Sequence, residues 1–252
     1  MPPQFNMRIT FIGTSHGVPS SDRYCSCIMI EVGEKLYFID AGAPLPDAIL
    51  RLGKKVNDIR AVFTTHVHGD HVCGLFQLCD LISWHYRNAF MTVFITEEEL
   101  ITQIKNTVRL LSGTDAEKRI NFELTLPDKV YSDDLVRVSF IPTKHKNGGA
   151  KPSFAIRFEA EGKKLIFTGD LSGLLSLDDF PKEISEEETD LVVCEMAHFD
   201  AEHIYPRMQT AKTKNFCFTH VFPLDKYDSI EGFRNDFPFR VLTPNDGDTV
   251  EL

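Results

Sequence analysis

One short segment, 65–71, constrains the fold of this chain more than any other feature. It places three histidines and one aspartate within six residues, directly behind the apolar run 61–64. In an extended backbone, side chains two residues apart point to the same side, so His66 and His68 can bind one metal ion. The segment therefore predicts a metal site at the end of a buried strand.

The second half of this segment offers two further ligands. A turn at Gly69 would direct Asp70 and His71 toward a second ion. Imidazole nitrogen and carboxylate oxygen suit zinc, and also manganese or iron at similar geometry. The alternative is a histidine-rich surface turn, but this spacing of ligands behind a strand favours the metal site.

Two coordination spheres need more ligands than one segment holds, and three later segments supply them. His145, Asp170 and His220 each follow a short apolar run that is typical of a buried strand. Loops gather at the carboxyl ends of such strands, where ligands from distant parts of the sequence can meet. The sequence thus predicts two divalent ions, most readily zinc, with these ligands: His66, His68, Asp70, His71, His145, Asp170 and His220.

The order of apolar patterns predicts the fold class. Strand patterns at 8–12, 27–32 and 35–40 precede an alternation of helices and strands, and a similar order returns from residue 135. Two similar halves of this kind pack their sheets face to face, with helices outside. We therefore expect an α/β (α+β) protein with a four-layer αββα sandwich. Because no composition break divides the chain, we expect residues 1–252 to form a single domain.

Periodicity also predicts the individual elements. The expected helices cover residues 46–52, 75–86, 100–111, 200–210 and 226–234. The later strands are expected at residues 91–95, 135–141, 153–158, 164–168, 191–194, 216–219, 239–242 and 249–252. In the helix at 100–111 the apolar stripe is expected to include Leu111. Trp84 and His85 are expected to pack at the end of the preceding helix.

Charge and composition limit the function. The chain has a formal net charge of -10, which argues against a general nucleic-acid surface, although a local positive site remains open. The N-terminus lacks a signal-peptide pattern, and no apolar run reaches the length of a membrane helix. We therefore expect a cytoplasmic protein without a membrane partner.

The six cysteines do not form a secreted disulfide pattern. We expect most of them to be buried thiols. Cys25 and Cys27 could contribute to a structural metal, but no second cysteine pair completes four ligands.

Two polar residues near the expected strand ends carry separate predictions. Asp40 ends a strand close to the metal segment, and we expect it to hydrogen-bond a ligand histidine or loop amides rather than to bind metal. His16 lies in a loop rich in glycine and proline, where a solvated side chain is favoured over one that touches substrate.

The metal motifs resemble those of the metallo-β-lactamase superfamily across essentially the entire chain. His66-x-His68-x-Asp70-His71, followed by later ligands at strand ends, is similar to its metal motifs in order and context. The presence of His71 implies a hydrolase, because redox-active diiron relatives look different in this segment. The resemblance implies one ion at His66, His68 and His145, a second ion at Asp70, His71 and His220, and a bridge between them at Asp170.

Within the superfamily, three segments resemble the phosphodiesterase branch: 11–19, 194–199 and 219–223. That branch includes ribonuclease Z and the cyclic phosphodiesterase of phosphonate breakdown. Ribonuclease Z usually carries a long tRNA-binding arm between the ligands that match His145 and Asp170, and here only about two dozen residues separate them. We therefore expect a small anionic substrate, a phosphodiester, rather than extended tRNA binding. A homodimer stays open.

The same residues predict a mechanism. A hydroxide that bridges the two ions would be the nucleophile, with Asp70 among the groups that hold it. His198 is the candidate general acid, and Glu195 could orient it. His198 acting only as a hydrogen-bonding partner of a ligand is the alternative, and His203 is a weaker candidate acid.

Two other functions fit the same ligands. The ion pair polarises a carbonyl as readily as a phosphoryl group, so a lactonase or another carboxylic ester or amide hydrolase is the main alternative. A metal-binding module without catalysis is the second alternative.

Overall fold

Strands that bury both faces form the centre of the molecule. The computed structural model describes residues 7–18, 20–145, 151–172 and 177–252. In β4 (Ile59–Phe63), Val62 packs against helices, and Phe63 packs against the opposite sheet. They face opposite ways because a strand turns successive side chains to alternate faces. Since both faces are covered, these strands have continuous apolar sequences.

The first sheet contains seven strands of the described residues, with β1 to β3 antiparallel and β3 to β6 parallel. Its order is β14 (Thr249–Glu251), β1 (Arg8–Gly13), β2 (Cys27–Val32), β3 (Lys35–Ile39), β4, β5 (Met91–Ile95) and β6 (Ile120–Leu124). Strand β14 comes from the second half of the sequence but belongs to the first sheet, where it pairs with β1.

The second sheet repeats this plan, again with seven strands of the part of the chain that the structure describes. Strands β10 to β13 are parallel, and β7 to β10 are antiparallel. The order is β13 (Arg240–Leu242), β12 (Asn215–Val221), β11 (Leu191–Met196), β10 (Lys163–Phe167), β9 (Phe154–Ala160), β8 (Val136–Pro142) and β7 (Val130–Ser132).

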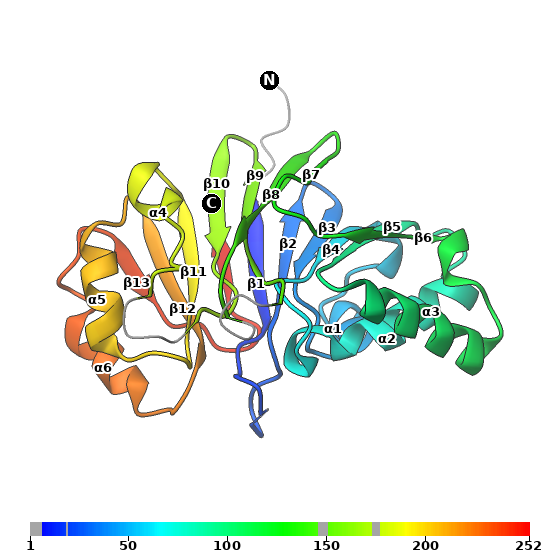
Figure 1. The fold of residues 1–252 in the computed structure, drawn as a ribbon, viewed down its shortest axis with the longest axis horizontal. Coiled ribbons are helices and arrows are strands. Elements are labelled where there is room, and N and C mark those ends of the chain that lie inside the picture. Colours follow the sequence, from blue (N-terminus) through cyan, green and yellow to red (C-terminus); the bar gives the residue numbers. More distant parts are fainter. Residues whose placement is uncertain (1–6, 19, 146–150, 173–176) are drawn as a thin grey trace.

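Helices cover the outer face of each sheet, so the layers run helix, sheet, sheet, helix (Figure 1). The first sheet carries α1 (Leu45–Arg51), α2 (Gly69–Trp84), α3 (Glu98–Ser112) and the 3₁₀ turns η1 (Val56–Asp58) and η2 (Ala116–Lys118). The second sheet carries α4 (Glu183–Glu186), α5 (Ala201–Gln209) and α6 (Lys226–Phe233). The predicted αββα sandwich is confirmed. None of the described helices is long and apolar enough to cross a membrane.

Three apolar clusters hold the four layers together. One lies between the first sheet and α1 to α3, and another lies between the second sheet and α4 to α6. The third lies between the two sheets, where aromatic side chains such as Phe63, Phe140 and Phe158 are fully or nearly fully buried. These clusters fix the two sheets relative to each other, and with them the loops at the strand ends.

Several elements differ from their predicted form. Helix α2 begins at Gly69, so the expected turn there is the first turn of a helix. Leu111, which was expected in the buried stripe of α3, is 65% exposed. Ile101 is buried in that stripe instead. Trp84 is 45% exposed rather than packed. Strands β6 and β7 have no counterpart among the predicted elements.

Candidate metal centre

The predicted ligands come from loops and strand ends of both sheets. His66 and His68 lie in the extended segment after β4, and α2 carries Asp70 and His71 in its first turn. An acidic residue suits this position because the amino end of a helix is positive. The remaining three ligands follow β8, follow β10 or lie in β12: His145, Asp170 and His220.

Four of these residues form the first ligand group: His66, His68, His145 and Asp170. His68 Nδ1 lies 3.0 Å from His66 Nε2 and 3.2 Å from His145 Nε2. Asp170 Oδ2 lies 3.8 Å from His66 Nε2 and 3.6 Å from His145 Nε2. Three imidazole nitrogens and one carboxylate oxygen therefore point at a common centre.

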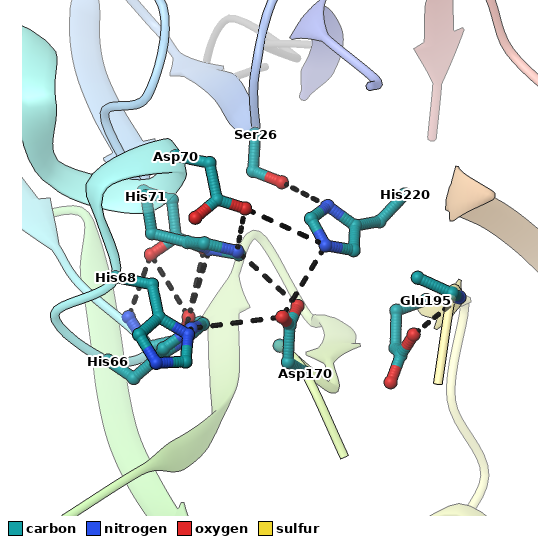
Figure 2. A network of polar contacts seen from close by, with 12 residues as sticks. Ser26, His66, His68, Asp70, His71, Asp170, Glu195 and His220 are labelled. Atoms are coloured by element: carbon teal, nitrogen blue, oxygen red, sulfur yellow. Dashed lines mark hydrogen bonds and ion pairs between the residues drawn. The ribbon is translucent and has the colours of Figure 1, made fainter. Parts of the chain in front are cut away.

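The second ligand group contains Asp70, His71 and His220. Asp70 Oδ2 lies 3.4 Å from His71 Nε2 and 3.8 Å from His220 Nε2. Figure 2 shows that these side chains also face Asp170, whose Oδ1 lies 3.4 Å from His71 Nε2 and whose Oδ2 lies 3.4 Å from His220 Nε2. The Asp170 carboxylate thus lies between the two groups.

The spacing of these atoms fits a metal centre. Zinc bonds to nitrogen and oxygen are about 2.0–2.2 Å long, so ligand atoms around a tetrahedral ion lie about 3.3 Å apart. The separations in the structure, 3.0–3.8 Å, bracket that value. In addition, His71 Nε2 is buried and has no hydrogen-bond partner among the described residues, as expected of a nitrogen whose lone pair binds an ion.

In three of the histidines, the ring nitrogen Nδ1 contacts an oxygen atom outside the ligand groups. His71 Nδ1 lies 2.7 Å from Asp40 Oδ2, His145 Nδ1 lies 3.0 Å from the Leu171 carbonyl, and His220 Nδ1 lies 3.1 Å from the Ser15 carbonyl. These oxygens accept a hydrogen bond from Nδ1–H and leave Nε2 as the metal-binding atom.

Asp40 has the predicted supporting position. Its carboxylate contacts His71, and it also accepts a hydrogen bond from the Thr65 backbone N–H at 2.8 Å. The predicted hydrogen bonds of Asp40 are therefore confirmed. Asp40 has a backbone φ of 58°, in the left-handed region, and its own N–H donates to the Phe63 carbonyl. Such a conformation is unfavourable for a non-glycine residue and is typical of functional sites.

His220 shares this unusual backbone. It lies within β12 with a φ of 54°, and its N–H donates to the Thr14 carbonyl at 2.9 Å. Gly169 also has a left-handed φ of 58°, and a Cβ there would lie 2.7 Å from the Thr65 Cβ. Only glycine therefore allows the Asp170 loop to approach the segment that carries His66.

Burial and charge set the protonation of the ligands. Burial lowers the pKa of His66 well below its ordinary value, and nearby histidines lower it further. Burial alone would raise the pKa of Asp170, but His220 and His71 outweigh it and hold that pKa well below the usual range. A neutral imidazole and an ionised carboxylate are the forms that bind metal.

His198 and Glu195 form a pair beside the ligands. Glu195 is buried in β11, and its Oε1 lies 3.0 Å from His198 Nδ1. The His198 ring lies 4.6 Å from the His145 ring, and its Nδ1 lies 3.9 Å from Asp170 Oδ2. Burial alone would lower the pKa of His198, but Glu195 and Asp170 outweigh it and raise the pKa to about 9. His198 thus lies beside the ligand groups, and its acidic neighbours favour its protonated form.

His203 does not reach this site. Its Nδ1 accepts a hydrogen bond from the Asp200 backbone N–H, as part of a capping box at the start of α5. This contact gives the side chain a structural role at a helix end. No contact among the described residues joins His203 to the ligand groups.

Other predicted residues have clear positions. His16 is half-buried rather than fully solvated, and its ring centre lies 3.9 Å from that of Phe222. Neither Cys25 nor Cys27 belongs to a ligand group in the described part of the chain. Burial raises the pKa of both thiols, which opposes their ionisation to metal-binding thiolates.

Asp179 is a supporting residue that the sequence does not reveal. It is buried, and its carboxylate accepts hydrogen bonds from the backbone N–H groups of Lys144 and Ser172 and from the Ser172 hydroxyl, at 2.8–2.9 Å. It therefore joins the loop of His145 to the loop of Asp170. No motif marks this position, because it is one of two adjacent aspartates in an acidic loop.

Asp246 holds a third loop in the same way. Its carboxylate accepts hydrogen bonds from the Thr14 N–H and hydroxyl and from the Tyr24 N–H. The loop that Asp246 holds contains the two backbone carbonyls that accept hydrogen bonds from His220. Since Asp246 lies more than 200 residues from Thr14, no local pattern could have identified it.

Comparisons with known proteins agree with this geometry. Ribonuclease Z of Acaryochloris marina is 30% identical over 155 residues, which are 61% of this chain and 48% of that protein. The chain spans about half the length of the curated relatives that it matches. The resemblance to the ribonuclease Z-like branch is thereby confirmed.

Several solved structures match almost the whole chain, and two of them illustrate the likeness. The metallo-β-lactamase fold protein YhfI from Bacillus subtilis has a TM-score of 0.78 at 16% identity and covers 98% of this chain and 100% of its own. A diphosphatase from the PhnP family has a TM-score of 0.72 at 18% identity and covers 98% of both chains. At these identities the likeness shows the fold, which is the metallo-β-lactamase fold.

A family model gives the most specific assignment. The model described as Anti-Pycsar protein Apyc1 matches residues 7–204, a region that contains six of the seven predicted ligands, all except His220. Because this match spans well over half of the 252 residues, the chain belongs to the Anti-Pycsar protein Apyc1 family.

Proposed function

We propose that this chain is a metal-dependent phosphodiesterase with two divalent ions, most readily zinc, that acts on a small substrate. The observation that carries the proposal is the position of Asp170, whose carboxylate lies within 3.4–3.8 Å of histidine nitrogens of both ligand groups. A carboxylate between two sets of ligands is the arrangement that a pair of neighbouring ions requires.

The charge of the centre favours an anionic substrate. Asp70 and Asp170 contribute two negative charges, and the histidine ligands contribute none when they are neutral. Two divalent ions held there would supply a water that ionises near neutral pH and a positive charge for a phosphoryl oxygen. The excess positive charge attracts a phosphodiester more strongly than a neutral ester or amide.

His198 and Glu195 complete the chemistry. At neutral pH, His198 is protonated because its pKa is raised to about 9, so it can donate a proton to the departing alkoxide. Glu195 accepts from Nδ1 and holds the ring, which leaves Nε2 as the atom that faces substrate. Glu195 also accepts from the backbone N–H groups of Leu171 and Ala197, so its own position is fixed.

We also propose that the whole site belongs to one domain. The ligands at 66–71 come from the first sheet, and His145, Asp170 and His220 come from the second. Neither half of the sandwich holds a complete ligand set alone. Only about two dozen residues separate His145 from Asp170, so we expect small phosphodiesters to be better substrates than tRNA.

A substrate panel tests this proposal. Purified protein, loaded in turn with zinc, manganese and iron, is assayed with bis-p-nitrophenyl phosphate, a lactone and a β-lactam, beside the Asp170→Ala variant. We expect hydrolysis of the phosphodiester, and loss of both bound metal and turnover in the variant. Preference for the lactone or the β-lactam would establish the alternative hydrolase, and bound metal without any turnover would establish a non-catalytic module.

A further inference from the structure

A basic cavity lies on the first sheet, away from the metal centre. It has a volume of about 500 Å³ and lies between the end of α2, the end of α3 and the turn η2. Four cationic side chains and one acidic side chain line it: Arg87, Arg109, Lys118, Arg119 and Asp115. The whole chain has 37 acidic and 27 basic residues, so the local charge is opposite in sign to the net charge.

Helix α2 separates this cavity from the metal centre. Asp70 and His71 are in its first turn, and Trp84 at its last position lines the cavity. The helix has 16 residues, which at 1.5 Å per residue gives a length of about 24 Å. A small ligand in the cavity therefore does not reach the ions, and the cavity is a distinct site.

Three of the cations have no partner in the described residues. The side chains of Arg87, Arg109 and Lys118 form neither an ion pair nor a hydrogen bond there, whereas nearby Lys105 pairs with Glu117 at 2.7 Å. Like charges that share a cavity repel one another unless an anion lies between them. Their arrangement therefore matches a negatively charged ligand.

Arg119 binds carbonyls at the carboxyl end of α2, so the other cations are not needed to cap that helix. Its guanidinium donates to the carbonyls of Ser83 and Arg87, at 3.1 and 3.0 Å. These bonds satisfy carbonyls at the negative end of α2 and fix the guanidinium as a rigid wall. The remaining cations are left to face the cavity.

Trp84 adds a flat apolar wall. Its Nε1–H donates to Asp80 Oδ2 at 3.1 Å, and the residue remains 45% exposed. An indole held in this way offers a face on which a planar ring can stack. The cavity volume lies within the range of small-ligand sites, roughly 300–1,000 Å³.

We propose that this cavity binds a compact polyphosphate, either free or as part of a nucleotide whose ring lies against Trp84. Two or three linked phosphates match the number of unpaired cations, and arginine binds phosphate oxygens through paired N–H groups. A single phosphate would leave part of this charge uncompensated. The proposal does not depend on the chemistry of the metal centre.

The sequence provides a direct probe of this site, because Trp84 is the only tryptophan in the chain. Tryptophan fluorescence of the purified protein is followed while sodium tripolyphosphate, ATP or orthophosphate is added. We expect a saturable change with tripolyphosphate and ATP, at concentrations about tenfold lower than with orthophosphate. Tighter binding of ATP would identify a nucleotide as the ligand, and equal binding would identify the phosphate chain alone.

Matched variants locate the binding. Lys118→Glu and Lys55→Glu change the net charge equally, but Lys55 is an exposed lysine outside the cavity. We expect Lys118→Glu to weaken tripolyphosphate binding about tenfold, and Lys55→Glu to weaken it less than about twofold. Arg109→Ala, at another exposed position, provides a second variant. Equal weakening by both glutamate variants, or no saturable change in the unmodified protein, would overturn the proposal.

A metal-centre variant gives the final control. His68→Ala removes a proposed ligand at the other end of α2 and should leave the fluorescence titration unchanged. Loss of the signal in His68→Ala would place the bound phosphate at the metal centre and overturn the proposal. Failure of the phosphodiesterase assay would leave this titration unaffected, so the two proposals are tested separately.

Discussion

At the scale of single residues, His198 shows how one side chain sets the charge of another. Its ring is only partly buried, yet Glu195 at 3.0 Å and Asp170 at 3.9 Å raise its pKa to about 9. A proton is therefore available beside the metal ligands at neutral pH. Replacing His198 by a residue without an acidic proton tests whether that proton is used in turnover.

The first prediction concerns His198→Ala. We expect the variant to keep its bound metal but to lose about 10²- to 10⁴-fold in turnover of a phosphodiester with a simple alkyl leaving group. Hydrolysis of bis-p-nitrophenyl phosphate should fall much less, because p-nitrophenolate departs without a proton. His203→Ala, which alters only a helix cap, is the control. Equal losses with both substrates would exclude His198 as the proton donor.

The second prediction concerns pH. Because the pKa of His198 is raised, the proton is present below that pKa and is lost as the pH rises through it. Two bound cations would lower this pKa by repulsion. Turnover of the alkyl phosphodiester should therefore decrease on the alkaline side with an apparent pKa of about 9 or below, and this decrease should be absent in His198→Ala. A pH profile that is the same in both proteins would contradict the assignment.

Residue types and spacing were sufficient to predict which seven side chains the structure brings together. His66, His68, Asp70 and His71 share one motif, and the other ligands follow recognisable strands. The supporting residues were harder to predict, because Asp179 and Asp246 act through backbone N–H groups of other loops. Such contacts depend on where loops meet in space, which local sequence does not encode.

At the scale of elements, the loops after β8 and β10 share one anchor. Asp179 accepts hydrogen bonds from the backbone next to His145 and from the backbone two residues after Asp170, while Asp178 pairs with the side chain of Lys144 at the surface. The two neighbouring aspartates therefore make a matched pair for testing loop position.

The third prediction uses this pair. Asp179→Ala should weaken zinc binding about 10- to 100-fold, as is typical when a residue that orients metal ligands is removed. Asp178→Ala should leave zinc binding nearly unchanged, because exposed ion pairs contribute little. Zinc affinity is measured by competition with a chelator. Similar affinities in the two variants would show that the Asp179 contacts do not position the ligands.

Element prediction worked best where both faces of a strand are buried. Strands β5 and β11 have continuous apolar runs and were identified, whereas β6 is partly exposed at a sheet edge and β7 has only three residues. The buried apolar stripe of α3 differs from the predicted one at its ends, because it includes Ile101 and does not include Leu111. Short edge strands and helix ends depend on neighbours rather than on their own pattern.

At the scale of the whole molecule, packing between the sheets positions the metal centre. Ligands from the first half of the chain meet ligands from the second half because the two sheets pack together, and one apolar cluster lies between those sheets. The superfamily resemblance predicted this sandwich, and the structure adds which side chains hold it together.

The fourth prediction addresses that packing. Phe158 has no exposed surface and lies between the sheets, so Phe158→Ala should lower the free energy of unfolding by about 3–5 kcal/mol. Leu110→Ala, at an 84% exposed position, should change it by less than about 0.5 kcal/mol. Urea unfolding curves measure both values. A small effect of Phe158→Ala would mean that the interface between the sheets contributes little to stability.

The most direct test of the central claim is a titration of metal-free protein with Zn²⁺ while hydrolysis of bis-p-nitrophenyl phosphate is followed. Because the seven ligands form two groups that meet at Asp170, we predict that activity rises with added zinc and reaches its plateau at two ions per chain. A plateau at one ion per chain, or no hydrolysis at any ratio of zinc to protein, would contradict the account.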